Sequence, residues 1–235
     1  MINEEVANNK EYGLFTNVSY YTEEDLEYVY MPQEDTLHLL KALDNIFAKK
    51  KISSILEIGC GSGVISAFCA SRNPSATITC SDINSKALDL CARTFEFHKL
   101  VRPNLVRMDL LTALKPGYSP DLIIFNPPYV PSPSNDIWSP ERQREYEEAH
   151  EKVGFRTCLD FALDGGVDGT EVTYRFLEQL INVLDKEAVA VLVTIEDNYP
   201  DKILEWLDKH GFCGEKCERA SYEAEELVII EITKK

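Results

Sequence analysis

The chain lacks the segments that carry proteins into or across membranes. Its apolar residues never gather into a run long enough to span a bilayer. Residues 1–5 contain neither the basic region nor the apolar segment of a signal peptide. We therefore expect neither a membrane span nor export. We expect the protein in the cytoplasm, and a nuclear location stays open as an alternative.

Positive charge is also scarce. The chain has 24 Lys and Arg residues against 40 Asp and Glu residues, a net charge of −16 at pH 7. A nucleic acid duplex would be repelled, because no basic stripe offsets this charge. The balance weighs against DNA and suits a protein substrate with a basic surface, although solubility alone also explains it. No G-x-x-x-x-G-K-[ST] loop occurs, which argues against an ATPase.

The seven cysteines lack the spacing of a disulfide framework. An odd number of cysteines without such spacing indicates reduced thiols in the cytosol or nucleus. Cys213 and Cys217 have C-x3-C spacing, but no second pair follows and only His210 is close in sequence. We therefore predict no metal site.

Apolar runs alternate with helical patterns along the 235 residues, which predicts one α/β domain with a parallel sheet. We expect residues 31–235 to form this domain and the polar segment 1–30 to be partly mobile. The segment 131–169 is long for a loop, and we expect it on the substrate side, with a surface helix over 141–152. Strands are expected near 55–58, 76–80, 105–107, 122–125, 189–194 and 227–232, and helices near 32–47, 64–70, 85–98, 171–184 and 202–210.

The most informative stretch is Asn126-Pro127-Pro128-Tyr129, which follows the apolar run 122–125. Two prolines end a strand at once, so Asn126 is placed at the carboxyl end of a central strand, where open α/β sheets bind ligands. The Asn126 side-chain oxygen and the Pro127 carbonyl offer two acceptors that face one point. Such a pair suits an NH2 group on a planar carbon, as in an amide or an adenine. The alternative interpretation is a proline-rich turn without a function.

A second motif, Glu57-Ile58-Gly59-Cys60-Gly61-Ser62-Gly63, follows a predicted strand and opens a helix. This is the usual place for a nucleotide-like ligand, although a glycine-rich turn alone is a weak signal. It is not the dinucleotide fingerprint, because Val64 stands where a glycine is required. Glu57 would repel a pyrophosphate and would pair with an ammonium group.

Acidic residues follow the next two predicted strands. Asp82 is placed to accept hydrogen bonds from ribose hydroxyls, and Ile83 to cover an adenine. Asp109, within Met108-Asp109-Leu110, is placed to accept from the adenine amine. Either aspartate could instead be a helix cap or a loop carboxylate. Ribose, adenine and an ammonium group without a phosphate describe S-adenosylmethionine.

With these motifs the chain resembles class I methyltransferases, and among them the HemK-like release-factor glutamine methyltransferases in their eukaryotic and archaeal branch. The resemblance spans about residues 28–234. Further segments that carry it are 29–36, with the pattern Tyr-x-Pro-x-Glu-Asp-Thr, and the later segments 165–169 and 193–198. The Asn-Pro-Pro-Tyr motif alone is shared with DNA adenine methyltransferases.

The resemblance implies a Rossmann-like sheet of seven strands, mostly parallel with one antiparallel strand. It implies S-adenosylmethionine as the cofactor and Asn126, Pro127 and Tyr129 as the catalytic residues, with Tyr129 packing against the substrate amide. The cofactor-binding residues that it implies are Tyr30, Thr36, Glu57, Gly59, Gly61, Asp82, Ile83, Asp109, Leu110 and Asn126.

The same resemblance implies methylation of the glutamine side chain in the Gly-Gly-Gln loop of a class I translation termination factor. It also implies a heterodimer with a small zinc-binding activator protein. The activator would dock at the edge of the third strand, around 105–110, beside a helix that carries Leu88, Phe95 and Phe97. N6-adenine methylation of nucleic acid, protein lysine methylation and a non-catalytic binding role stay open as alternatives.

Two features depart from the family pattern. The loop 131–164 is longer than usual and carries a charged insertion, which affects how a substrate would dock. Cys60 stands between the cofactor glycines, and we expect it to make the site sensitive to thiol reagents.

Overall fold

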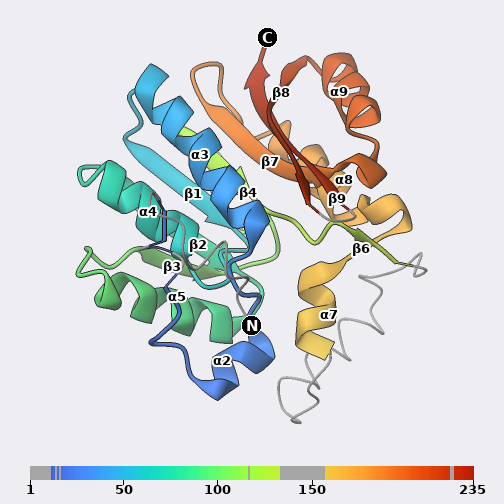
Figure 1. Cartoon of the computed structure of the whole chain (residues 1–235). Helices are drawn as coiled ribbons and strands as arrows, with labels where there is room; N and C mark the ends of the chain where they lie inside the picture. Colours follow the sequence, from blue (N-terminus) through green and yellow to red (C-terminus); the bar gives the residue numbers. More distant parts are fainter. Residues whose placement is uncertain (1–11, 14, 16, 116, 133–156, 223–224) are drawn as a thin grey trace.

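The structure, a computed structural model, describes residues 12, 13, 15, 17–115, 117–132, 157–222 and 225–235. A seven-stranded sheet in the order β3-β2-β1-β4-β7-β9-β8 forms its centre (Figure 1). The strands are β1 (Ser54–Ile58), β2 (Thr77–Asp82), β3 (Asn104–Arg107), β4 (Leu122–Phe125), β7 (Val189–Ile195), β8 (Phe212–Tyr222) and β9 (Glu225–Lys234).

Only β9 runs against the other strands of this sheet, since it pairs antiparallel with both β7 and β8. All pairings among β3, β2, β1, β4 and β7 are parallel. The predicted fold class, a mostly parallel seven-stranded sheet with one antiparallel strand, is therefore confirmed. The residue pattern had not indicated β8, because this edge strand is mostly half-buried or exposed and carries charged residues.

Helices cover both faces of the sheet. One face packs against α3 (Glu34–Lys49), α4 (Val64–Arg72) and α5 (Ser85–Phe97), and the other against α8 (Glu171–Leu180) and α9 (Pro200–Lys209). Alternate residues of a strand face the two helix layers. In β4, Leu122 and Ile124 face the layer of α3, α4 and α5, and Ile123 and Phe125 face the layer of α8 and α9. Because both faces are covered, β4 is apolar throughout and fully buried.

The amino-terminal segment packs against the domain where the structure describes it. Tyr12 and Phe15 are buried and meet the Phe68 ring edge-on, with ring centroids 5.7 Å and 5.4 Å away. A short helix, α2 (Glu23–Tyr28), follows and leads into α3. The polar composition of this segment did not indicate these aromatic anchors.

The segment after the Asn-Pro-Pro-Tyr motif adds a small second sheet of β5 (Val130–Pro131) and β6 (Asp164–Gly166). It also adds helix α7 (Thr157–Leu163) and a 3-10 turn, η1 (Val167–Gly169). The helix expected over 141–152 lies outside the described residues. The helix expected over 171–184 ends earlier, at Leu180.

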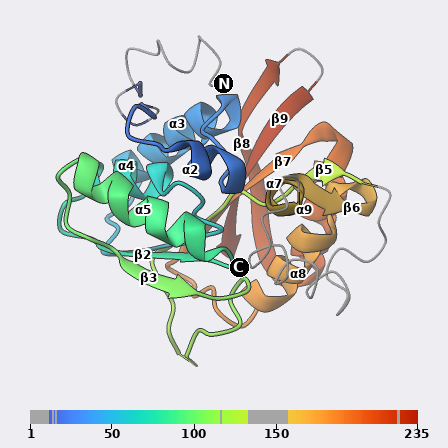
Figure 2. The same cartoon turned by 90° about the horizontal axis from the view of Figure 1, so that it is seen from below.

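The parallel strands all end at one edge of the sheet, which Figure 2 views from below. The start of α3, the helix α7 and the small sheet gather around this edge. Each helix in the described part of the chain is too short or too polar to span a lipid bilayer.

Candidate active site

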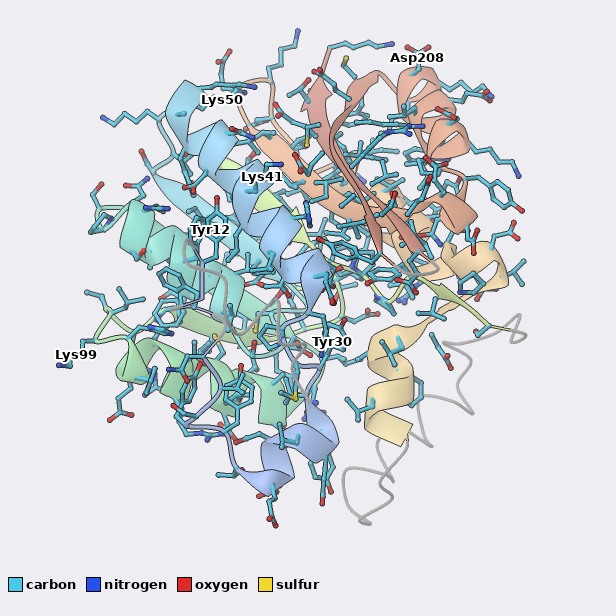
Figure 3. All side chains as sticks on the ribbon, viewed as in Figure 1. Tyr12, Tyr30, Lys41, Lys50, Lys99 and Asp208 are labelled. Atoms are coloured by element: carbon cyan, nitrogen blue, oxygen red, sulfur yellow. The ribbon has the colours of Figure 1, made fainter. Side chains whose placement is uncertain are left out.

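One cavity opens at the carboxyl edge of the sheet, and every site residue predicted from the sequence lines it. Figure 3 shows the labelled Tyr30 at this edge, between the start of α3 and α7. The predicted residues that the cavity brings together are Tyr30, Thr36, Glu57, Gly59, Gly61, Asp82, Ile83, Asp109, Leu110, Asn126, Pro127 and Tyr129. The convergence follows from the topology, because the segments after β1, β2, β3 and β4 all emerge on the same side.

The glycine-rich turn forms one wall of the cavity with bare backbone. Gly59, Gly61 and Gly63 have φ angles of 59°, 49° and 75°, which residues with a Cβ rarely adopt. A Cβ on Gly63 would lie 2.4 Å from the Cys91 sulfur, so this glycine also permits close packing of α4 on α5. The turn therefore lets a ligand approach the main chain at the start of α4.

Asp82 ends β2 and closes the turn from the side. Its carboxylate accepts hydrogen bonds from the backbone N–H of Gly61 (2.9 Å) and of Asn84 (2.8 Å). Burial raises the pKa of Asp82 to about 6, because the ionised form loses contact with water. Hydrogen-bond donors from a bound ligand would stabilise the ionised form, and the two hydroxyl groups of a ribose are such donors.

Glu57 is held by the protein more firmly than the sequence suggested. It is buried, and its Oε2 accepts a hydrogen bond from the backbone N–H of Ser66 in α4 (3.0 Å). Burial raises its pKa well above the ordinary value. One carboxyl oxygen thus anchors α4, while the side chain still lines the cavity, where the glycine-rich motif predicted an ammonium partner for Glu57.

Asp109 and Leu110 form the wall after β3. The Asp109 carboxylate pairs with the guanidinium of Arg175 from α8 at 2.5 Å, a contact that the sequence did not indicate. Leu110 has φ of 49°, a strained angle for a residue with a Cβ. Strain of this kind is often found at ligand sites, and here it lies in the cavity wall.

The Asn126 amide is fixed in one orientation. Its Nδ2 donates to the Oδ2 of Asp35 at 2.7 Å, and Tyr129 donates its hydroxyl to the same oxygen at 3.4 Å. Asp35 is buried at the start of α3, and burial raises its pKa. The Asn126 Oδ1 is buried and has no hydrogen-bond partner in the described structure.

This orphaned oxygen is an acceptor held ready for a donor. A buried polar atom without a partner costs free energy, so such atoms often mark sites that a ligand completes. The sequence assigned Asp35 no role in the site, although it belongs to a segment that carries the family resemblance. Its position in the Tyr-x-Pro-x-Glu-Asp-Thr segment, directly before Thr36, is the sequence feature that could have indicated its role.

Cys60 also lines the cavity, but the structure argues against the expected sensitivity to thiol reagents. Its side chain is 4 % exposed. Hydrogen bonds with Cys80 and Cys91, together with burial, raise the pKa of the Cys60 thiol well above its ordinary value. Since the thiolate is the reactive form, Cys60 is a poor nucleophile here.

The cavity fits S-adenosylmethionine by its donor and acceptor set. Bare glycine backbone, the Asp82 carboxylate at the end of β2 and the orphaned Asn126 oxygen surround one space. Apolar walls come from Ile83, Leu110 and Phe161. Such walls suit a flat base between polar ends.

Comparisons with known proteins found similar methyltransferases. The family model "Methyltransferase small domain" matches residues 34–137. Human methyltransferase HEMK2 is 34 % identical over 211 residues, covering 88 % of this chain and 90 % of that protein. The eRF1 methyltransferase catalytic subunit mtq2 of Schizosaccharomyces pombe is 32 % identical over 199 residues, with 78 % and 80 % covered.

A solved structure is also similar over most of its length. It is the Mtq2–Trm112 complex of E. cuniculi, described as responsible for methylation of the eRF1 translation termination factor. Its matching chain has a TM-score of 0.63 and 27 % sequence identity, covering 89 % of this chain and 99 % of that chain.

Proposed function

The chain belongs to the HemK-like family of S-adenosylmethionine-dependent protein methyltransferases, and from this premise we propose that it methylates the glutamine side chain in the Gly-Gly-Gln loop of a class I translation termination factor. The observation that carries the proposal is the Asn126 amide, with its Nδ2 tied to Asp35 and its Oδ1 free to accept. Relatives whose names state this activity, and the eRF1 assignment of the similar complex, support the choice of substrate.

The acceptor nitrogen of glutamine needs orientation more than it needs a base. Its lone pair is delocalised into the carbonyl, and its two N–H groups can be bonded by two oxygens. The Asn126 side-chain oxygen and the Pro127 carbonyl are the two acceptors that we assign. Both residues line the cavity beside Tyr129, which packs against the flat amide in this proposal.

S-adenosylmethionine supplies a methyl group on a positively charged sulfur. As the amide nitrogen formed its bond to that methyl group, the methyl–sulfur bond would break with its electron pair left on sulfur, and the nitrogen would release one N–H proton to water. The N–H groups would become more acidic during this step, so the bonds to Asn126 and Pro127 would strengthen. Interactions that strengthen in the transition state accelerate the reaction. Asp35 contributes indirectly, because it holds the Asn126 oxygen, and not its NH2 group, toward the substrate.

We assign the cofactor to the residues on the other side of the cavity. Asp82 would hold the ribose, Ile83 and Leu110 would flank the adenine, and Asp109 would accept from its amine. The glycine-rich turn with Glu57, together with Tyr30 and Thr36, would enclose the methionine part of the cofactor. All of these residues line the same cavity as Asn126.

A methyl-transfer assay tests the proposal directly. The chain is incubated with labelled S-adenosylmethionine, with and without a zinc-binding activator, and with a termination factor, duplex DNA or a histone. We expect transfer to the termination factor and none to a variant factor whose Gly-Gly-Gln glutamine is replaced by asparagine. Transfer confined to DNA or to histone lysine would reject the proposal in favour of one of the alternatives.

The Asn126→Ala variant tests the mechanism in the same assay. Losing one preorganised acceptor should cost about 2.7–4 kcal/mol, or about 10²–10³-fold in rate. The matched control is Asn182→Ala, because Asn182 is exposed at the end of α8 and does not line the cavity. Near-normal activity of Asn126→Ala would contradict the mechanism.

We further propose that a small zinc-binding activator pairs with the outer edge of β3. The similar complex supports a small protein partner, and β3 is the terminal strand of the sheet beside α5 (Figure 2). Phe97, the last residue of α5, and Val101, which lies between α5 and β3, are 39 % and 86 % exposed. Leu88 and Phe95, which we had also expected there, are buried in the core and cannot contribute.

A proline substitution in β3 tests this pairing. The backbone N–H of Met108 donates to Asp82 in β2, so by the two-residue period the N–H groups of Leu105 and Arg107 point outward. Leu105→Pro removes an outward donor without breaking a bond to β2, and Leu105→Ala is the control that keeps it. We expect co-purification with the activator to be lost only in Leu105→Pro; equal loss in both variants would contradict pairing through the backbone.

A further inference from the structure

Asn198 is a buried amide whose hydrogen bonds join three separate segments. It is 2 % exposed and lies in the 3-10 turn η2 (Glu196–Asn198), directly after β7. Its Oδ1 accepts from the backbone N–H of Ile195 at 2.9 Å. Its Nδ2 donates to the carbonyl oxygen of Tyr129 at 2.8 Å and to that of Asp168 at 2.9 Å.

The backbone packs closely around this amide. Gly169, with φ of 66°, packs against it, and a Cβ there would lie 2.0 Å from the Tyr129 oxygen and 2.4 Å from the Asn198 Nδ2. A Cβ on Gly165 would lie 2.5 Å from the Gly169 oxygen. The two glycines therefore bring the η1 backbone close enough for one amide to bond both carbonyls.

The hydrogen bonds of Asn198 are connected to the acceptor site through the backbone of the Asn-Pro-Pro-Tyr motif. Tyr129 is the last residue of the Asn-Pro-Pro-Tyr motif, and its carbonyl oxygen is bonded by Asn198. At the other end of the motif, Asp35 fixes the Asn126 side chain. The turn that carries the Pro127 carbonyl is thus held at both ends, by two residues far apart in the sequence.

We propose that Asn198 is a positioning residue for methyl transfer, which sets the path of the Asn-Pro-Pro-Tyr turn and thereby the place of the Pro127 acceptor. This inference rests on the proposed function, because it concerns the same acceptor site. Asn198 does not line the cavity, so its effect is on the turn and not on cofactor binding. Small displacements of positioned groups lower rates strongly, by up to about 10²-fold for 1 Å.

Two variants and one control separate positioning from general stability. Asn198→Ala removes all three hydrogen bonds, whereas the nearly isosteric Asn198→Asp keeps an acceptor for Ile195 and removes the donors to Tyr129 and Asp168. The control is Thr194→Val on β7, which removes the buried bond from the Thr194 hydroxyl to the Val228 carbonyl (2.8 Å) without touching the turn.

The expected result is a split between kinetic and binding constants. Both Asn198 variants should lose about 10- to 100-fold in kcat on the termination factor. Their Kd for S-adenosylhomocysteine should stay within about twofold of the wild type, because the cofactor walls are unchanged. Hydrogen exchange of the peptide over 122–132 should speed up in both, and Thr194→Val should show neither effect.

Each other result has a definite meaning. A wild-type protein that is inactive on the termination factor even with the activator present would reject the proposed function, whereas the exchange measurement would still test the role of Asn198. The inference is overturned if wild type is active and the Asn198 variants match Thr194→Val in kcat or in exchange. It is also overturned if cofactor affinity falls as much as kcat, since that marks a general loss of structure. Should Asn198→Ala fail to fold, the same criteria apply to Asn198→Asp.

Discussion

Replacing Asp35 should lower activity, and the Asp35→Asn variant should be at least as stable as the wild type. Asp35 is buried, and its Oδ2 receives the Asn126 Nδ2 at 2.7 Å. Without this acceptor the Asn126 amide can turn over, so that its NH2 group meets the NH2 group of the substrate. Only one of the two orientations of the Asn126 amide then presents its oxygen to the substrate, and this orientation has to be adopted each time a substrate binds.

The magnitude follows from the type of hydrogen bond that is lost. A bond to a charged group contributes about 1.5–3 kcal/mol, and a neutral one about 0.5–1.5 kcal/mol. Asp35→Ala should therefore lose about 10- to 150-fold in kcat. Asp35→Asn keeps a neutral acceptor and should lose only about fivefold, the equivalent of about 1 kcal/mol.

Stability should move in the opposite direction. Burial raises the pKa of Asp35, which means that its ionised form is disfavoured in the folded protein relative to the unfolded chain. Asp35→Asn removes that penalty at neutral pH, so its melting temperature should equal or exceed that of the wild type.

The measurements are single-turnover methylation of the termination factor, calorimetric binding of S-adenosylhomocysteine and thermal unfolding. Asp44→Asn is the control on the same helix, since Asp44 binds Tyr12 and Arg72 away from the cavity. Full activity of Asp35→Ala would refute the orientation argument. A fall in melting temperature that parallels the fall in rate would point to a structural role for Asp35.

Three further predictions concern the cofactor side of the cavity. Because the pKa of Asp82 is raised to about 6, and the ribose needs the ionised form, the affinity for S-adenosylhomocysteine should fall about tenfold per pH unit below 6. Calorimetry should show this fall in the wild type and a shallower one in Asp82→Asn, in which only the other buried carboxyl groups titrate. Arg175→Met removes the partner of the partly exposed Asp109 carboxylate. Calorimetry should show the Kd for S-adenosylhomocysteine raised by no more than about fivefold, the equivalent of about 1 kcal/mol. A larger loss of affinity would mean that Arg175 does more than orient Asp109. In a mass-spectrometric time course with N-ethylmaleimide, the exposed Cys213 should react well before the buried Cys60, and the reverse order would contradict the raised pKa of the Cys60 thiol.

The sequence predicted the parts of the site that follow from local pattern. The run 122–125 ends at two prolines, so Asn126 could be placed at a strand end without knowing the fold. Asp82 could be placed by its distance from the glycines, since a strand, a turn and a helix have nearly fixed lengths. Such features combine short-range geometry with the rule that parallel strands end on the same side.

What the sequence did not predict depends on contacts between distant segments. Asp35 and Asn126 are separated by 91 positions, and Arg175 and Asp109 by 66. No pattern near Asp35 distinguishes a carboxylate that orients an amide from one that favours a helix start. Leu88 and Phe95 were misplaced for a related reason, because only packing decides which side of α5 meets the sheet.

The buried carboxyl groups make the cavity selective for charge. Asp35, Glu57 and Asp82 are 5 %, 3 % and 8 % exposed, and burial raises the pKa of each. Three such carboxyl groups around one cavity do not stabilise the folded protein by themselves. A cationic occupant, however, stabilises their ionised forms, and the sulfonium of the methyl donor loses its charge when the methyl group leaves. We therefore expect the protein to bind the charged methyl donor more tightly than the product, so that methyl transfer would favour product release.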